Sequence, residues 1–425
     1  MKPICLFATI LLTCQFALAQ GGQKALVEQA LARHPKIAAA RAAIQAEKAG
    51  KGELLSPFRP MASLNGYMAG GDGSMIFSST VDPINQAMLP PDGVLMGNVM
   101  LMWKVWTGGR ESAARSLGDS RIGAAEHMLS VVEQDVALGV RLAASEYAFR
   151  TGAMDAARAK RDAARAAEQN ATQMEEAGKV PRAFVLRAAS EARRSEQEVA
   201  KAEAALATAL AMLEEAAGGA VAIGDGLQPE VLELPATLDE ALRLGDNRDE
   251  LQFFIAMAEA HGIEASYVRR SLRPEVSIMA MGMSMRRDSG AGETGAKFGL
   301  VVSVPLTDGG MRSSKAKMLE ARAQEFMAQA EQMRLTVRRE IQSAWAEWSA
   351  AGEVTESALA GLAAAEESYE VERLRFESGK SIIAELLDAL AVLHEARLGV
   401  VEAVQYRQDS SARLKRAVGG GGSGP

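Results

Sequence analysis

Two proline-free, alanine-rich stretches constrain the fold of this chain more than any other feature. Residues 111–176 contain four glycines and no proline, and residues 311–377 contain two glycines and no proline. A continuous helix of about 66 residues, at 1.5 Å per residue, would be roughly 100 Å long, whereas an ordinary globular helix has about a dozen residues. We therefore expect two coiled-coil-like rods, which the small alanine side chains allow to pack closely against neighbouring helices.

The two halves of the sequence follow the same plan. Arg59-Pro60 in the first half matches Arg273-Pro274 in the second, and each pair opens a strand-like segment. The stretch MEEAGKVPRAFVL matches RFESGKSIIAELL, which aligns Gly178-Lys179 with Gly379-Lys380. Each half is expected to run helix, two strands, very long helix, Gly-Lys break and helix. We interpret this pattern as an internal duplication.

Besides the two rods, the sequence predicts four shorter helices and four strands. The helices are expected at about 36–56, 182–217, 249–271 and 381–417. The strands are expected where apolar residues alternate with small or polar ones, at about 61–69, 94–105, 275–286 and 297–306. Glycine-rich loops at 70–93 and 287–296 would join each strand pair.

The two ends of the chain are expected to lie outside the fold. Residues 1–19 are typical of a secretory signal peptide with an Ala-x-Ala cleavage site, although the residues before Cys14 also resemble a lipoprotein signal that would acylate it. Cleavage after Ala19 would remove Cys5 and Cys14, leaving a mature chain with no thiol. The expected divisions are a signal peptide (1–19), a first repeat (20–218), a linker (219–236), a second repeat (237–418) and a flexible tail (419–425).

Composition narrows the class of function. A net charge of −7 gives no sign of nucleic-acid binding. After the signal, no stretch reaches the roughly 20 apolar residues of a membrane helix, so a membrane-crossing form would need a closed β-barrel. Two hairpins are too few for such a barrel, whereas three chains would supply twelve strands. The four histidines are scattered singly, and neither a phosphate-binding glycine loop nor a Gly-x-Ser-x-Gly motif occurs, so we expect no enzyme, no cofactor and no metal centre.

In their order and spacing, these features resemble the TolC family of outer-membrane efflux proteins over roughly residues 25–418. The similarity rests on the duplicated plan and on the turns EEAGKVPRAFVL and FESGKSIIAELLDAL. It implies a mainly α fold with a membrane β-barrel, in which a homotrimer forms a twelve-stranded barrel in the lipid of the cell outer membrane and an α-helical barrel in the periplasm. It further implies the exit duct of a tripartite efflux pump or type I secretion system, with a periplasmic adaptor protein and an inner-membrane transporter as partners.

The resemblance also implies a periplasmic gate at the tip turns Gly178-Lys179 and Gly379-Lys380. The family pattern of an aromatic residue and two carboxylates falls on Phe376, Glu385 and Asp388. Three copies of these carboxylates would ring the narrowest point and favour cations, although an ordinary solvated helix face is the alternative. Phe376 stands where tyrosine is common, and Ala183-Phe184 where Thr-Asp is usual. We hypothesise that packing of Phe376 and Phe184, more than salt bridges from Lys380 or Arg182, holds the gate closed.

The strand segment SIMAMGMSMRR has methionine at every second position. We expect these methionines to face lipid together with the apolar row of the next strand, because apolar residues alternate with small lumenal ones in barrel strands. The lipid-facing residues would be Met279, Met281, Met283, Met285, Phe298, Leu300, Val302 and Val304.

The alternative for the methionine row is a soft-metal path, since thioethers bind monovalent copper or silver. In the preceding strand, Met96, Met100 and Met102 could face the lumen beside Asn98 and Lys104. Copper or silver efflux is therefore one alternative function, and a periplasmic coiled-coil scaffold without a channel is another.

Overall fold

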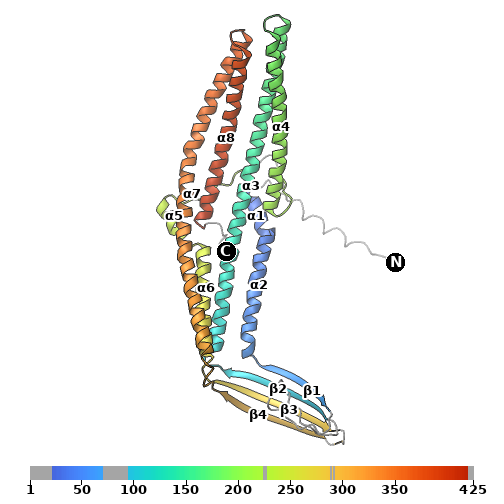
Figure 1. Cartoon of the computed structure of the whole chain (residues 1–425), viewed down its shortest axis with the longest axis vertical. Helices are drawn as coiled ribbons and strands as arrows, with labels where there is room; N and C mark the ends of the chain where they lie inside the picture. The colour runs from blue at the N-terminus through green and yellow to red at the C-terminus, as the bar shows by residue number, and fades with distance from the viewer. Residues whose placement is uncertain (1–21, 70–93, 224–226, 288–289, 291, 420–425) are drawn as a thin grey trace, which may run out of the picture. The chain divides into compact units, whose positions relative to one another are not determined.

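The computed structural model describes residues 22–69, 94–223, 227–287, 290 and 292–419. The expected signal peptide, the loop at 70–93 and nearly all of the tail lie outside these residues. The first repeat contains α1 (Gln23–Arg33), α2 (Pro35–Leu55), the short 3-10 helix η1 (Ser56–Phe58), β1 (Met61–Ala69), β2 (Val94–Trp106), α3 (Arg110–Glu176) and α4 (Arg182–Ala217). The second contains α5 (Leu238–Gly245), α6 (Asp249–Arg270), β3 (Glu275–Arg287), β4 (Gly292–Ser303), α7 (Met311–Glu377) and α8 (Ile383–Ala417) (Figure 1).

The predicted long helices and strand pairs are confirmed. Helices α3 and α7 have 67 residues each, and every predicted helix ends within about two residues of its expected bounds. Strand β4 begins at Gly292 instead of residue 297, because it pairs with β3 along nearly its whole length. The loop between β3 and β4 is correspondingly shorter than predicted. The short helices α1 and α5, one at the start of each repeat, are not predicted by the sequence analysis.

The chain divides into two compact units. Among the described residues, unit 1 comprises those within 22–42, 127–251 and 331–419, and unit 2 comprises those within 43–126 and 252–330. The long helices α3 and α7 contribute residues to both units. Among the described helices, none combines the length and the apolar character needed to cross a membrane.

Unit 1 is built from helices whose buried residues are mostly alanine, leucine and valine. One cluster packs α1 and α2 against α3 and α4, through Leu26, Ile37, Val140 and Leu213. A second packs α5 against α7 and α8, through Ala241, Ile341 and Leu414. The two clusters occupy corresponding positions in the two repeats, since each joins a short first helix to the long helix and to the end of the last one.

The last helix of each repeat ends near a glycine in the left-handed backbone region. Gly218, with φ of 74°, follows α4, and Gly419, with φ of 77°, follows α8. A Cβ on Gly218 would lie 3.1 Å from Cα of His34, and one on Gly419 would lie 3.1 Å from Cγ of Arg248. At both positions the backbone angle and the close approach favour glycine.

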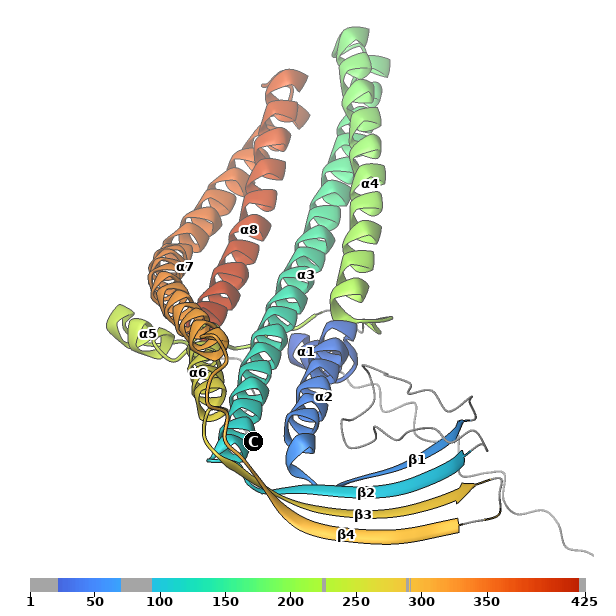
Figure 2. The same ribbon diagram turned by 60° about the horizontal axis from the view of Figure 1, so that its bottom comes forward.

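Unit 2 contains a four-stranded antiparallel sheet in the order β1-β2-β3-β4 (Figure 2). The two central strands belong to different repeats, so the sheet joins the two halves of the chain. The ladder between β2 and β3 is regular except for a shift between Lys104 and Trp106. Within the described strands, β1 and β4 each have only one neighbour, which leaves two open edges.

The register of β3 and β4 corrects one sequence prediction. Directly opposite residues of an antiparallel pair share a face of the sheet. Phe298, Leu300 and Val302 lie opposite even-numbered residues of β3, from Ala280 to Val276. The odd-numbered row from Met279 to Met285 therefore lies on the other face, and the prediction that both rows face lipid is wrong.

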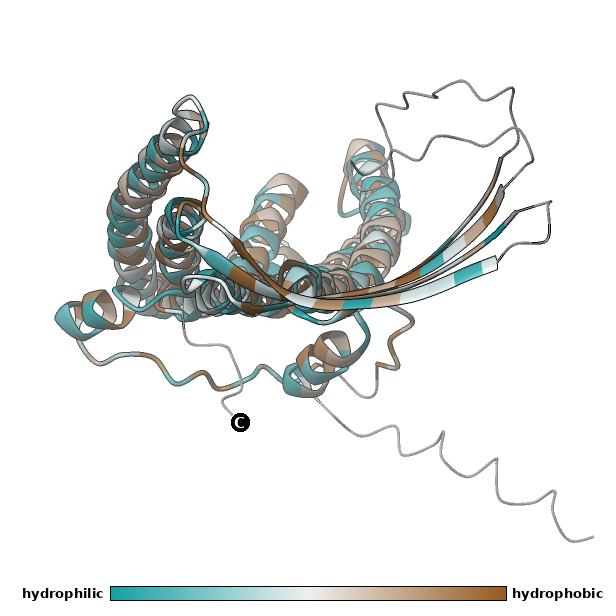
Figure 3. Ribbon diagram, turned by 90° about the horizontal axis from the view of Figure 1, so that it is seen from below, coloured by the Kyte–Doolittle hydropathy of each residue, from teal (hydrophilic) through white to brown (hydrophobic). Residues whose placement is uncertain are grey.

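The physical reason for this error is the nature of the alternation signal. A period of two assigns the residues of one strand to two rows, but only the pairing with a neighbour decides which rows share a face. Figure 3 shows that both hydrophobic and hydrophilic residues occur along the strands. Val304 follows the end of β4 and is 50% exposed.

Candidate functional site

The two Gly-Lys turns, which join α3 to α4 and α7 to α8, have the same backbone structure. The amide of Lys179 donates to the carbonyl of Met174 at 2.8 Å, and the amide of Lys380 donates to that of Arg375 at 2.8 Å. Gly178 and Gly379 have φ of 68° and 70°, and their amides donate to the carbonyl three residues earlier. This pattern is a Schellman helix end, in which glycine supplies the left-handed residue.

The predicted gate aromatics lie in one hydrophobic cluster formed by all four helices beside these turns. Phe376 of α7 is only 1% exposed, and Phe184 of α4 is half-buried beside it. The other buried members are Ala167, Ala171, Ala188, Ile383 and Leu386. A side chain buried this completely in its own chain cannot contact a passing molecule. Its place in the cluster suits it to hold the hairpin of one repeat against that of the other.

The two predicted gate carboxylates are exposed. Glu385 and Asp388 lie on the solvent side of α8, away from the buried Ile383 and Leu386. Glu385 is in the first turn of α8, where a negative charge also favours the helix N-terminus. Helix stabilisation is therefore a structural alternative to the predicted gate role of this residue.

The polar partner of Glu385 is Ser381, which sequence reasoning did not single out. The Ser381 hydroxyl lies 2.5 Å from Oε2 of Glu385 and 2.9 Å from Oε2 of Glu372. Because a hydroxyl carries one hydrogen, it donates to only one of these carboxylates at a time. Arg375 pairs with Glu372 at 2.5 Å. Over the described residues, no ion pair joins Glu385 or Asp388 to Lys380, Arg182 or another cation of this chain.

A second polar region lies in unit 1, at the start of α6 and the ends of α5 and α8. Arg248 is 5% exposed and bonds Oε1 of Glu250 at 2.7 Å and Oε2 of Glu340 at 2.6 Å. Arg416 contacts the same Glu250 and also bonds Asp135 at 2.8 Å. Burial alone would raise the pKa of Glu250, but the hydrogen bonds and charges of the two arginines outweigh it and hold the pKa at about 2.

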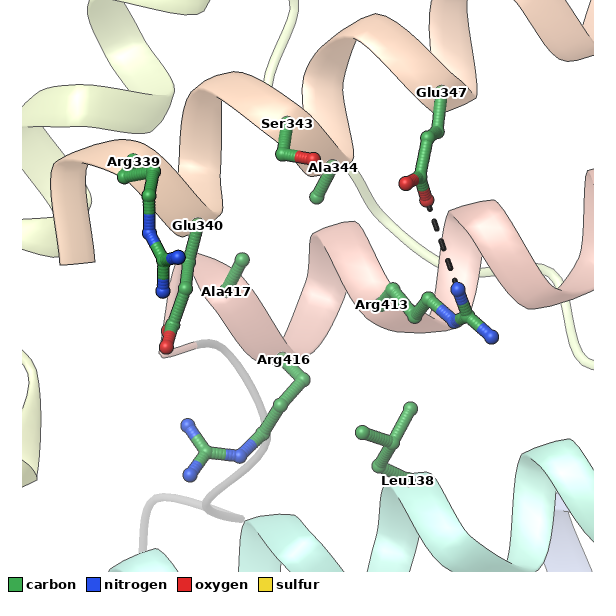
Figure 4. A pocket seen from close by; sticks show the side chains of 9 residues that line it. All are labelled: Leu138, Arg339, Glu340, Ser343, Ala344, Glu347, Arg413, Arg416 and Ala417. Carbon is green, nitrogen blue, oxygen red and sulfur yellow. Dashed lines mark ion pairs between the residues drawn. The ribbon is translucent and has the colours of Figure 1, made fainter. Parts of the chain in front are cut away.

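A shallow pocket of about 360 Å³ opens beside this charged region (Figure 4). Its lining residues come from α3, α7 and α8: Leu138, Arg339, Glu340, Ser343, Ala344, Glu347, Arg413, Arg416 and Ala417. Glu340 and Arg416 are already bonded within the network, and Arg413 lies 3.8 Å from Glu347. The pocket therefore has the character of a structural ion-pair region.

The two faces of the sheet in unit 2 have different compositions. One face is apolar and highly exposed, with Leu64 at 79%, Met68 at 85% and Phe298 at 79%. The other carries the methionine rows together with polar groups. On that face the Asn65 amide donates to Oδ1 of Asn98 at 3.0 Å, and Lys104 lies 3.6 Å from Glu275.

Comparison with known proteins agrees with this architecture. Residues 243–420 match a family model described as outer membrane efflux protein. The match runs from within α5 to just beyond the end of α8, so the second repeat is similar to this family over nearly its whole length. The description names proteins of the outer membrane, which agrees with the location that the sequence resemblance implies. No curated protein is a significant match to the sequence.

Solved structures extend the similarity from residues 243–420 to nearly the whole chain. A structure of CusC, described in terms of folding and transmembrane channel formation, has a TM-score of 0.79 at 17% identity and covers 96% of each chain. The outer membrane protein VceC of Vibrio cholerae has a TM-score of 0.78 at 17% identity, over 94% of this chain and 96% of its own. The open MtrE outer membrane channel of Neisseria gonorrhoeae has a TM-score of 0.75 at 17% identity, over 94% and 89%. At this identity, the matches establish a shared fold.

The matched range contains the second-repeat residues predicted at the gate, namely Phe376, Gly379, Lys380, Glu385 and Asp388. The first-repeat residues Gly178, Lys179 and Phe184 lie outside the matched range. Their assignment rests on the internal repeat, which the identical turn geometry supports.

Proposed function

We propose that three copies of this chain form an outer-membrane exit duct for an efflux pump or a type I secretion system. The observation that carries the proposal is the sheet of unit 2, which has one apolar face, one partly polar face and two open edges. In lipid, every backbone polar group needs a partner, so a spanning sheet has to close on itself. Pairing of β4 of one copy with β1 of the next closes such a ring by a repeated head-to-tail contact.

Three copies give twelve strands, within the range of outer-membrane barrels. Two copies would give eight strands, and the choice of three follows the resemblance to the TolC family. The apolar face with Leu64, Leu300 and Phe298 would meet lipid. The face with Asn65, Asn98 and Lys104 would line the lumen.

In this duct, Glu385 and Asp388 would form the periplasmic gate. Both are exposed and lie next to the turn at Gly379, so three copies could bring six carboxylates around one axis. Such a ring favours cations and excludes anions. An adaptor protein bound at the exposed turns would open the gate, with an inner-membrane transporter supplying energy.

The test is the conductance of the full-length protein in a planar bilayer. We expect a small, cation-selective conductance that rises and loses selectivity in Glu385→Ala/Asp388→Ala. The matched control is Glu402→Ala, an exposed carboxylate further along α8, which should leave the conductance unchanged. No conductance from any variant would refute the duct and favour a coiled-coil scaffold. Large and equal conductances would keep the duct and refute the carboxylate gate.

A further inference from the structure

The face of the sheet opposite the apolar one is rich in methionine. Pairing of the four strands brings together residues that are far apart in the sequence. Eight methionines share this face: Met61, Met96, Met100, Met102, Met279, Met281, Met283 and Met285. Seven of the eight lie on the two central strands.

These methionines pair directly across the strands. Met102 lies opposite both Met61 and Met279, which makes a row of three. Met100 lies opposite Met281, and Met96 lies opposite Met285. Directly opposite residues have Cβ atoms about 5 Å apart, and three rotatable bonds let each thioether turn toward its neighbour. Two or three sulfur atoms can therefore converge on one point.

Neighbouring rows follow one another at short intervals. Residues two apart on a strand are separated by about 7 Å, so the four methionines of β3 extend over about 20 Å. Glycines on β4 leave room beside two of them, since Gly295 lies opposite Met283 and Gly299 opposite Met279. A Cβ at either glycine would meet no atom within 4 Å. The other two methionines lie opposite charged residues, Met281 opposite Lys297 and Met285 opposite Glu293.

The other face shows that these positions do not simply need an apolar residue. There the large apolar residues are mainly leucine, valine and phenylalanine, and Met68 is the only methionine on the described strands. On the methionine face, among residues whose side chains the structure describes, Val301 is the one other large aliphatic residue. The two faces of the same strands thus use different chemistry. Burial of apolar surface does not account for this difference, because leucine would serve it equally.

We propose that this methionine face binds monovalent soft metal ions, copper(I) or silver(I), as cargo in transit. Thioethers are soft ligands that select such ions over hard cations. Successive rows let an ion exchange one set of sulfurs for the next along the strands. The inference rests on the proposed duct, because it takes this face as the lumenal one. It adds a cargo class, because the duct proposal alone does not say which substrate is transported.

The experiment is silver(I) binding to the full-length protein in detergent, in chloride-free nitrate buffer, followed by calorimetry and silver X-ray absorption. The row variant is Met61→Leu/Met102→Leu/Met279→Leu, which preserves volume and so should preserve the fold. The matched control removes three exposed methionines of α7, in Met311→Leu/Met318→Leu/Met327→Leu. Circular dichroism checks that both variants are folded.

We expect silver(I) to bind the wild type with sulfur neighbours in the absorption spectrum. The row variant should bind at least tenfold more weakly at its tightest site, and the control should stay within twofold of the wild type. Equal binding by the row variant and the wild type, or a spectrum without sulfur neighbours, would overturn the proposal. Binding of an apolar dye without silver(I) would also overturn it, and would assign the methionines to organic cargo.

Failure of this inference is distinguishable from failure of the duct. Conductance without silver(I) binding refutes the metal cargo and leaves the duct intact. Row-dependent silver(I) binding without conductance refutes the duct and the transit of cargo through it, and leaves only a metal-binding face.

Discussion

The first and second repeats share the backbone structure of their turns and helix ends, and they differ in the polar side chains beside them. Both have a glycine-centred turn between the long helix and the last helix, and both end the last helix near a left-handed glycine. At that helix end, however, Gly218 packs on half-buried His34, whose ring accepts a hydrogen bond from the Lys36 amide, whereas Gly419 packs on buried Arg248. Only the second repeat has a carboxylate in the first turn of its last helix.

The difference shows that the two repeats share their backbone geometry more than their side-chain chemistry. Any side chain destabilises the left-handed backbone conformation, so both repeats have glycine at this position. An ion-pair network or an exposed carboxylate can be lost from one copy when the other supplies it. The proposed gate chemistry is accordingly concentrated in the second repeat. Three predictions test this comparison.

The largest effect should come from the two aromatics of the shared cluster. Phe376→Ala removes a fully buried ring and should destabilise the helical unit by about 3–5 kcal/mol. Phe184→Ala removes a half-buried ring and should cost about 1–2 kcal/mol. Thermal unfolding followed by circular dichroism in detergent measures both. Equal losses would mean that the two repeats contribute equally to this core, contrary to the burial of the two rings.

An intermediate effect should come from pH. The pKa of Glu250 is about 2 in the folded chain, below its ordinary value of 4.5. Between pH 2 and pH 4.5 the unfolded chain therefore binds a proton at this carboxylate that the folded chain does not bind. The contribution of ionised Glu250 to the stability of the folded chain is complete above about pH 4.5 and is lost as the pH falls toward 2. Allowing for solvent screening, it is on the order of 2 kcal/mol.

Glu250→Gln should therefore flatten the fall in melting temperature between pH 5 and pH 3. The first-repeat control is Glu133→Gln, which breaks the more exposed pair with Arg41 at 3.6 Å and should change stability by less than about 0.5 kcal/mol. A steeper acid dependence in Glu250→Gln than in the wild type would contradict the sign of this pKa shift.

The smallest effect should be the same in both repeats. Gly178→Ala and Gly379→Ala place a Cβ in open space at φ near 70°, so the cost is that of the left-handed backbone, about 1 kcal/mol each. Gly178→Asn and Gly379→Asn should recover part of it, because asparagine tolerates this region better. Unequal losses from the two alanine variants would show that the turns are not equivalent despite their matching hydrogen bonds.

Much of the fold could be predicted from the sequence because its signals are local. The absence of proline over 311–377 and the glycine at 379 predicted the bounds of α7. The alternation of methionine with small residues predicted strand β3. Helix α5 also had a local signal that sequence reasoning missed, the Thr-x-x-Glu pattern of a capping box at Thr237 and Glu240. The Thr237 hydroxyl accepts from the Glu240 amide, and the Glu240 carboxylate accepts from the amide of Ala236, one residue before the N-cap.

The rest depended on contacts between distant residues. Which face receives Met279 follows from its pairing with Met102, and no property of either strand alone contains that information. Burial of Arg248 likewise follows from Glu340 and the carbonyl of Ala417, 92 and 169 residues away. Glu385 would be exposed both on an ordinary solvated helix face and in a gate. A measurement on the assembled protein is needed to distinguish these two roles.

The open edges of the sheet have a consequence for biogenesis. Within the described strands, β1 and β4 each present a row of unpaired amides and carbonyls, which in an isolated chain can pair with any extended peptide nearby. In the proposed duct, the last backbone hydrogen bonds of the sheet form only when another copy arrives. Assembly is then a step of folding itself, and the yield of native protein depends on how many chains meet before other strands occupy those edges.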